Sequence, residues 1–283
     1  MIRDKVIAMK SAEMIKESLI EASRILPEDA MHSIMSAIPS GGKAESVMNA
    51  IKKNIDIAEA RQMPLCQDTG AFWCLASIGR DSSASIGDIE KIVNEGAAAA
   101  AEEGYFRKSI VSDPVFGRVN TKTNLPVFIN YEVVEGKDVT LRFLLKGFGS
   151  ENCSSVMMLN PTAGEEGVVS AVIEMMKKAG GKPCPPVFLG IGIGGTLDRA
   201  AINAKKAFFV QSDDERYIAL GERIREEVDR LEIGPGGLGG YPTALGVYVL
   251  EEATHIAGLP VALSVSCWAE RKAETVFPGG VLC

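Results

Sequence analysis

The feature that most constrains the fold is a change of hydrophobic period on the two sides of one short polar stretch, Pro-Leu-Cys-Gln-Asp-Thr-Gly at residues 64–70. Before it, apolar residues recur at helical spacing in a pattern that ends near Ala60. After it, the apolar run from Ala71 to Ile78 is typical of a buried strand. The stretch therefore predicts a loop between a helix and a strand.

This loop carries a thiol, a carboxamide, a carboxylate and a hydroxyl in consecutive positions, from Cys66 to Thr69. Taken alone, it is also consistent with an ordinary turn, because Asp and Gly form turns and a buried Cys packs as a small apolar residue. Two more cysteines, Cys153 and Cys267, lie in loops of similarly small and polar residues. Their presence favours a chemical role.

Apart from this loop, helical and strand-like patterns alternate along the chain. The first sixty residues read as a layer of three helices, which would pack on a mixed β-sheet in an α/β fold. Residues 127–133 and 139–145 alternate like strands, and the turn at 135–138 predicts a hairpin between them. The further expected elements are strands over 72–78, 187–189 and 259–265, and helices over 86–103, 164–179, 196–207 and 213–231.

Charge and hydropathy exclude several classes of function. The net charge of −7 argues against a nucleic-acid partner, because neutralising phosphates requires a basic surface. No run of about 18 uncharged apolar residues could span a bilayer, and the N-terminus lacks a signal-peptide core. We therefore expect a cytoplasmic protein whose six cysteines are reduced thiols, metal ligands or catalytic groups.

Cys66, Cys153 and Cys267 are the candidate ligands of a metal site. They are 87 and 114 residues apart, which is neither zinc-finger nor ferredoxin spacing, so only the fold could gather them. Three thiolates could bind zinc with a fourth ligand, or hold three irons of a cubane cluster and leave one open. Cys74, Cys184 and Cys283 are expected to be incidental.

A glycine-rich run supports a rival hypothesis. Gly190, Gly192 and Gly195 match the spacing of a dinucleotide-binding loop, and Asp213 lies about the right distance beyond. This pattern is compatible with a nicotinamide-dependent oxidoreductase. However, the apolar stretch 208–210 is short for the second strand, and the same glycines could instead place a helix N-terminus against a substrate carboxylate.

Several motifs together resemble one family in matching order, over about residues 10–275. They are Cys-Gln-Asp-Thr-Gly from Cys66, Lys-Gly-x-Gly-Ser-Glu-Asn from Lys146 to Cys153, Gly-Ile-Gly-Gly-Thr from Gly192, Gly-Pro-Gly-Gly-Leu-Gly-Gly from Gly234, and His255 followed by Leu-Pro-Val-Ala and Cys267. The chain is similar to the α subunit of class I iron-sulfur fumarate hydratases and L-tartrate dehydratases. Phe148 departs from the pattern, where the family usually has a glycine.

The resemblance implies a class I fumarase N-terminal-domain-like fold, with residues 1–283 as one catalytic domain. It implies a [4Fe-4S] cluster with Cys66, Cys153 and Cys267 as its ligands. The substrate-binding residues it implies are Gln67, Asp68, Arg107, Gly147 and His255. Among these, Asp68 and His255 would be the catalytic acid–base groups.

The activity implied is that of a hydro-lyase that interconverts fumarate and L-malate, as in the tricarboxylic acid cycle, or dehydrates L-tartrate to oxaloacetate. The open iron would act as a Lewis acid. Because the family pairs this half with a smaller β half, the resemblance also implies a separate β subunit and an α2β2 heterotetramer. A nicotinamide-dependent oxidoreductase remains the alternative, and a zinc-stabilised binding module is a third possibility.

Overall fold

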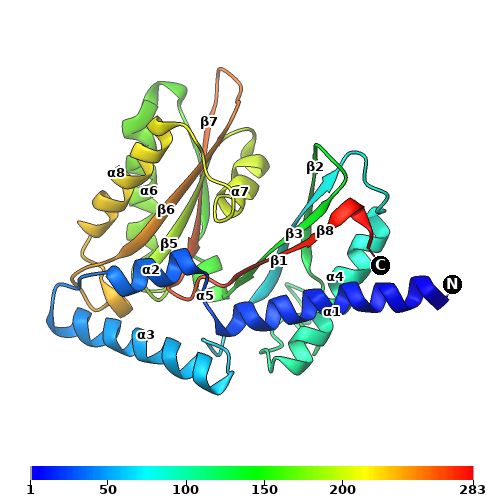
Figure 1. Cartoon of the computed structure of the whole chain (residues 1–283). Coiled ribbons are helices and arrows are strands. Elements are labelled where there is room, and N and C mark those ends of the chain that lie inside the picture. Colours follow the sequence, from blue (N-terminus) through cyan, green and yellow to red (C-terminus); the bar gives the residue numbers. More distant parts are fainter. Residues whose placement is uncertain (1, 283) are drawn as a thin grey trace. The chain divides into compact units, whose positions relative to one another are not determined.

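The structure, a computed structural model, describes the backbone of residues 2–282 and the side chains of residues 10–282. Cys283 lies outside the described residues. The chain divides into two compact units (Figure 1). The first unit comprises Met1–Pro27, Asn54–Gly147 and Arg271–Cys283, and the second comprises Glu28–Lys53 and Phe148–Glu270. The loop at residues 64–70 belongs to the first unit.

The first unit is a four-stranded mixed sheet with the order β2-β1-β3-β8. Its strands are β1 (Ala71–Gly79), β2 (Phe128–Val134), β3 (Val139–Lys146) and β8 (Lys272–Phe277). Strand β1 pairs parallel with β2 and antiparallel with β3, which pairs antiparallel with β8. The expected strand over 72–78 is thus confirmed as β1, and it is central because it is buried along nearly its whole length.

Two helices, α1 (Ile2–Arg24) and α4 (Ile86–Glu103), form one core with this sheet. The helices approach closely because a Cβ atom on Gly96 would meet the Ala12 carbonyl oxygen at 2.7 Å. Ser85 caps α4 by accepting a hydrogen bond of 3.1 Å from the Asp88 amide. This packing places the end of α4, and the loop that follows it, at a defined position beside the sheet.

The hairpin expected between residues 127–133 and 139–145 is wrong, although both strands exist. Strand β1 lies between β2 and β3, so the turn at 135–138 passes over the end of β1. The Gly79 amide donates to the Asp138 carbonyl at 2.8 Å, and the Asp81 amide donates to the Gly136 carbonyl at 3.0 Å. A largely apolar, buried strand gains more by pairing on both edges than at a sheet edge, which explains the insertion.

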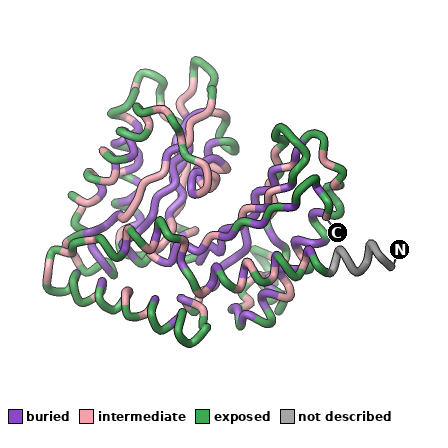
Figure 2. Tube along the Cα trace, viewed as in Figure 1, coloured by how far each residue is buried: buried purple, intermediate pink, exposed green. Residues whose placement is uncertain are grey.

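The second unit has the strand order β4-β7-β5-β6, with β5 and β6 parallel and the other pairs antiparallel. Its strands are β4 (Ser155–Leu159), β5 (Val187–Gly194), β6 (Ala244–Glu252) and β7 (Leu259–Ser266). Helices α6 (Gly164–Ala179) and α8 (Glu215–Asp229) share one apolar core with β5 and β7. Strands β1, β3, β5 and β7 are largely buried, whereas the helices expose one face (Figure 2).

Helix α7 (Leu197–Lys206) packs closely against β5 of this sheet. Gly190 and Gly192 lie within β5, where a Cβ atom would meet the carbonyl oxygens of Ala204 and Ala200 at 2.0 and 2.1 Å. Two of the three glycines expected to form a dinucleotide-binding loop, Gly190 and Gly192, are therefore strand residues that allow the α7 backbone to approach, while Gly195 lies between β5 and α7. Residues 207–209 form a turn and not a second strand. These findings remove the structural basis for a nicotinamide site.

The remaining helices confirm the three-helix prediction for the first sixty residues, with α2 (Glu28–Ser36) and α3 (Gly42–Arg61) following α1. Their residues are divided between the two units. The prediction missed strands β4, β6 and β8. Short elements complete the fold, namely α5 (Phe148–Glu151), η1 (Pro161–Ala163), η2 (Pro235–Gly237) and η3 (Pro278–Gly280). Among the described residues, no helix is long and apolar enough to cross a membrane.

We predict that Gly192→Ala lowers the free energy of unfolding by about 1–3 kcal/mol, because the added methyl group would overpack the β5–α7 contact. Gly87→Ala is the matched control. Gly87 lies in the first turn of α4 at negative φ, and the nearest atom to its Cβ would be 3.8 Å away. The Gly87→Ala control is expected to leave the free energy of unfolding unchanged or to raise it by about 0.4–1 kcal/mol. Urea titrations followed by circular dichroism measure both values, and equal stability of the two variants would contradict the packing argument.

Candidate functional site

The loop from Leu65 to Gly70 is held by its main chain. The Leu65 amide donates to the Ser23 carbonyl at 2.8 Å, and the Leu65 carbonyl accepts from Asn54 Nδ2 at 2.9 Å. At the other end, the Gly70 carbonyl accepts from Nδ2 of the buried Asn124 at 3.0 Å. These hydrogen bonds fix the backbone at both ends of the loop.

The middle of the loop has two further anchors. The Asp68 carbonyl accepts a hydrogen bond of 2.9 Å from Arg271 Nη2, and Thr69 Oγ1 accepts one of 2.9 Å from the Arg107 amide. Thr69 is buried, whereas Gln67 is exposed and Asp68 is half-buried. The side chains of Gln67 and Asp68 are therefore accessible to a ligand while their backbone is held in place.

Two glycines allow the loop to lie directly on the end of β3. Gly70 adopts φ +82°, and a Cβ atom there would meet the Lys146 carbonyl oxygen at 2.2 Å. A Cβ atom on Gly147 would lie 3.2 Å from Oδ2 of Asp68, so the carboxylate lies close to the Gly147 backbone. Three of the predicted substrate-binding residues, Gln67, Asp68 and Gly147, are thus brought together in the first unit.

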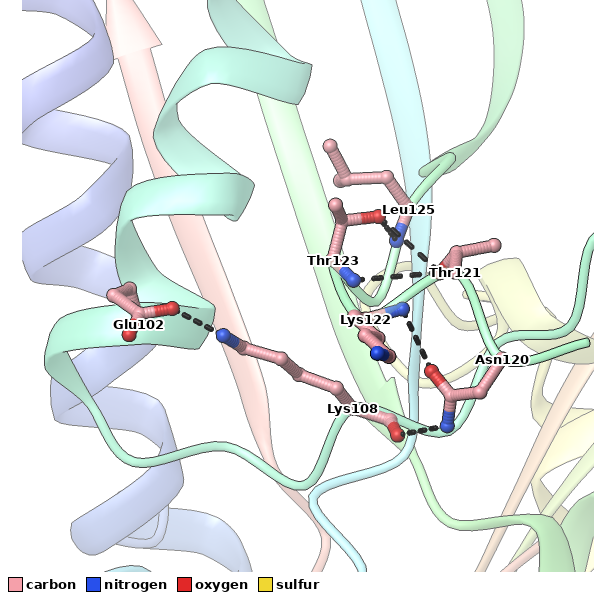
Figure 3. Close-up of polar contacts among 7 residues, drawn as sticks. All are labelled: Glu102, Lys108, Asn120, Thr121, Lys122, Thr123 and Leu125. Carbon is pink, nitrogen blue, oxygen red and sulfur yellow. Dashed lines mark hydrogen bonds and ion pairs between the residues drawn. The ribbon is translucent and has the colours of Figure 1, made fainter.

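Arg107 joins the same group, because its backbone amide contacts Thr69 and its side chain is exposed. It begins a polar segment that ends at Leu125 and is organised by its own side chains (Figure 3). Asn120 Nδ2 donates to the Lys108 carbonyl at 2.7 Å, and the Lys122 amide donates to Asn120 Oδ1 at 2.7 Å. Much of the polarity of this segment therefore serves to shape it.

Two buried cationic residues lie at the same end of the sheet. Arg271 and Lys146 have exposed fractions of 2% and 5%. They are close in the fold because the Leu145 amide donates to the Arg271 carbonyl at 3.0 Å. Positive charge at the Asp68 loop is suited to binding an anion.

Cys66 lies in the first unit, and Cys153 and Cys267 lie in the second. All three are half-buried thiols. Cys153 lies in the turn between α5 and β4, while Cys267 directly follows β7. The β4–β7 register pairs Ser155 with Leu263, and Ser154 Oγ accepts from the Val265 amide at 3.1 Å. Cys153 and Cys267 therefore lie at the same end of this strand pair.

His255 lies at the other end of β7 from Cys267. It is exposed in the connection between β6 and β7, and its Nδ1 accepts a hydrogen bond of 3.1 Å from the Ala257 amide. A strand of eight residues separates the two ends by about 25 Å. Within the second unit, His255 is not brought together with the two cysteines.

The remaining described cysteines differ sharply from each other. Cys74 is fully buried in the core of the first unit, where burial raises the pKa of its thiol far above the usual range. Cys184 is exposed and follows α6 in the second unit. Within either unit, the described residues include no cluster of three His, Cys, Asp or Glu side chains that could hold a metal ion.

Phe148 fits the structure without strain. It is the first residue of α5 and does not adopt a positive φ, so no glycine is required at this position for conformational reasons. The residue that sequence analysis did not single out is Arg271, which contacts Asp68 across 203 positions of sequence. Asn124 was likewise passed over. The sequence pattern that could have drawn attention to Arg271 and Asn124 is the same for both, namely a polar residue in a short loop next to an apolar strand.

Comparison with known proteins shows extended similarity along the chain. The model of the family described as fumarate hydratase (Fumerase) matches residues 12–276. A protein of Methanocaldococcus jannaschii named putative L(+)-tartrate dehydratase subunit alpha is 39% identical over an alignment of 277 residues, with 94% of this chain and 96% of that protein covered. The L(+)-tartrate dehydratase subunit alpha of Escherichia coli K12 is 26% identical over 274 residues, covering 93% of this chain and 89% of that protein.

We predict that iodoacetamide at about pH 8 labels Cys184 at least about 100-fold faster than Cys74 in the folded protein. The thiolate is the reactive form. The raised pKa of Cys74 keeps its thiol protonated, and its burial keeps the reagent away from the sulfur. Peptide mass spectrometry measures both rates, and labelling in urea provides the control in which the two cysteines should react alike. Similar rates in the folded protein would contradict the placement of Cys74.

Proposed function

This chain belongs to the fumarate hydratase family, and we propose that it is the [4Fe-4S]-bearing α subunit of a hydro-lyase that acts on a 2-hydroxy dicarboxylic acid. Its activity is that of a hydro-lyase. The observation that carries the proposal is the anchored Cys66–Gly70 loop, which presents a thiol, a carboxamide and a carboxylate at the end of a sheet that also holds two buried cationic residues.

The proposed cluster ligands are Cys66, Cys153 and Cys267. Their chemistry fits such a group, because iron-sulfur clusters are held by thiolates and all three residues are half-buried thiols. Cys153 and Cys267 share one end of the β4–β7 pair, whereas Cys66 is supplied by the anchored loop. When bound, the cluster would supply a Lewis acid for the hydroxyl group that leaves.

The proposed substrate contacts come from the chain's own residues. Arg107, with its exposed guanidinium, would bind a substrate carboxylate through two parallel hydrogen bonds. Gln67 would contribute its carboxamide, and the backbone at Gly147 would lie close to the ligand. Asp68 would move a proton to or from the substrate, a role that contributes about 10²–10⁴ in rate for a well-placed group.

His255 is the least connected part of the proposed site. Its side chain lies at the opposite end of β7 from Cys267 in the second unit. Its assignment as a catalytic and substrate-binding residue stays a prediction, supported only by the resemblance to the family. The domain assignment of residues 1–283 as one catalytic domain also stays a prediction.

We propose a separate β subunit as the partner, in an α2β2 heterotetramer located in the cytoplasm. Support for a partner comes from the relatives, whose names describe them as alpha subunits. Those names also make L(+)-tartrate the first substrate to assay, while the family description makes fumarate and L-malate the second. Activity of the co-expressed subunits with any of these three substrates would support the proposal, and inactivity with all three under anaerobic conditions would contradict it.

We predict that Cys66→Ser, Cys153→Ser and Cys267→Ser each retain less than about half of the wild-type iron after anaerobic reconstitution, because each removes one thiolate ligand. Cys184→Ser, which changes an exposed cysteine outside the proposed site, is the matched control and should retain the wild-type amount. Iron and acid-labile sulfide assays measure the outcome. Equal iron in all four variants would refute the ligand assignment.

We further predict that Gly147→Ala lowers kcat by about 10-fold. The added methyl group would lie 3.2 Å from Asp68 Oδ2 and displace the carboxylate by a few tenths of an ångström, and small misplacements of reacting groups are costly. Gly117→Ala is the control, because the nearest atoms to its Cβ would be 3.8 Å away. Steady-state kinetics of the co-expressed subunits test this expectation, and an unchanged kcat for Gly147→Ala would contradict it.

A further inference from the structure

Arg271 is a buried guanidinium with only part of its hydrogen-bonding capacity in use. It immediately precedes β8, and its exposed fraction is 2%. Nη2 donates to the Asp68 carbonyl at 2.9 Å. Nε and Nη1 are buried and have no hydrogen-bond partner among the residues that the structure describes.

Such an arrangement is unfavourable for stability alone. Burying a cation is costly, and leaving buried donors unsatisfied adds to the cost, so an apolar side chain of similar length would stabilise a packed core better. The guanidinium therefore requires an explanation other than packing. Its one hydrogen bond within the described residues leads directly to the backbone of Asp68.

We propose that Arg271 is a positioning residue that fixes the peptide between Asp68 and Thr69, and thereby sets the direction in which Gln67 and Asp68 face the substrate. This proposal rests on the proposed function. The Asp68 residue is constrained from two sides, since its carbonyl oxygen binds Arg271 and its carboxylate lies close to Gly147. Without Arg271, the loop keeps its anchors at Leu65, Thr69 and Gly70 and loses the one at Asp68.

The shape of arginine matters for this role. Its planar guanidinium is held by burial in one orientation, so Nη2 is presented to the Asp68 carbonyl from a fixed direction. A lysine ammonium would keep the charge but present its donors from a single, more mobile point. Arg271→Lys should therefore give an intermediate effect, and Arg271→Met, which has similar length and no donor, should give the full effect.

Arg142→Met is the matched control. Arg142 lies on the neighbouring strand β3, and its Nε donates to Glu274 Oε2 on β8 at 2.7 Å. The Arg142→Met substitution therefore removes an arginine hydrogen bond from the same sheet without altering a contact of the Asp68 loop. All variants are made in the α chain co-expressed with its β subunit.

The first measurement is hydrogen–deuterium exchange of a peptide that contains residues 66–70, without substrate. Arg271→Met should accelerate exchange in this peptide by about 10-fold or more, while Arg142→Met should leave it unchanged. Unchanged exchange in Arg271→Met would overturn the proposal. Because this measurement needs no activity, it decides the positioning role even if the wild-type complex proves inactive, which would refute the proposed function alone.

The second measurement separates positioning from direct substrate binding. A positioning role predicts that kcat falls by about 100-fold in Arg271→Met with KM changed by less than about threefold, and by a smaller factor in Arg271→Lys. A rise in KM with an unchanged kcat would overturn the proposal and identify Arg271 as a substrate ligand. If Arg271→Met does not fold, Arg271→Lys is compared with Arg142→Met in its place. Exchange and kcat at the wild-type level in Arg271→Lys would then overturn the proposal.

Discussion

The structure of the candidate site depends on one constraint, namely that the loop before β1 is held by its main chain. Carbonyl oxygens of Leu65, Asp68 and Gly70 accept hydrogen bonds from the side chains of Asn54, Arg271 and Asn124. Backbone groups need partners when they are buried, and here those partners are supplied from three distant parts of the first unit. Fixing the backbone in this way leaves the reactive side chains available for a ligand.

Glycine has two different roles in the two units. In the first unit, Gly70 and Gly147 let one segment of backbone lie against another beside a polar side chain, which builds a site. In the second unit, Gly190 and Gly192 let helix α7 approach strand β5, which builds a core. The residue type alone does not distinguish the two roles in the sequence, whereas the atoms that a Cβ would meet in the structure do.

The chemistry expected of a hydro-lyase agrees with the distribution of charge in the first unit. Two buried cationic residues, Arg271 and Lys146, lie at the end of the sheet where Asp68 and Gly147 meet. Burial keeps water from screening these charges, so their effect on an anionic substrate is stronger than at an exposed surface. Membership of the fumarate hydratase family gives this arrangement its reaction class.

Local periodicity determined the helices, because helical spacing of apolar residues is set by neighbours three or four positions apart, and α1 to α4 follow the predicted pattern closely. The motif around Cys66 and the family resemblance likewise came from the sequence. Tertiary structure alone decided that β1 separates β2 from β3, that the glycines of β5 serve α7, and that Arg271 holds Asp68. Strand partners and buried hydrogen bonds are chosen by residues far apart in the chain, and no local pattern records that choice.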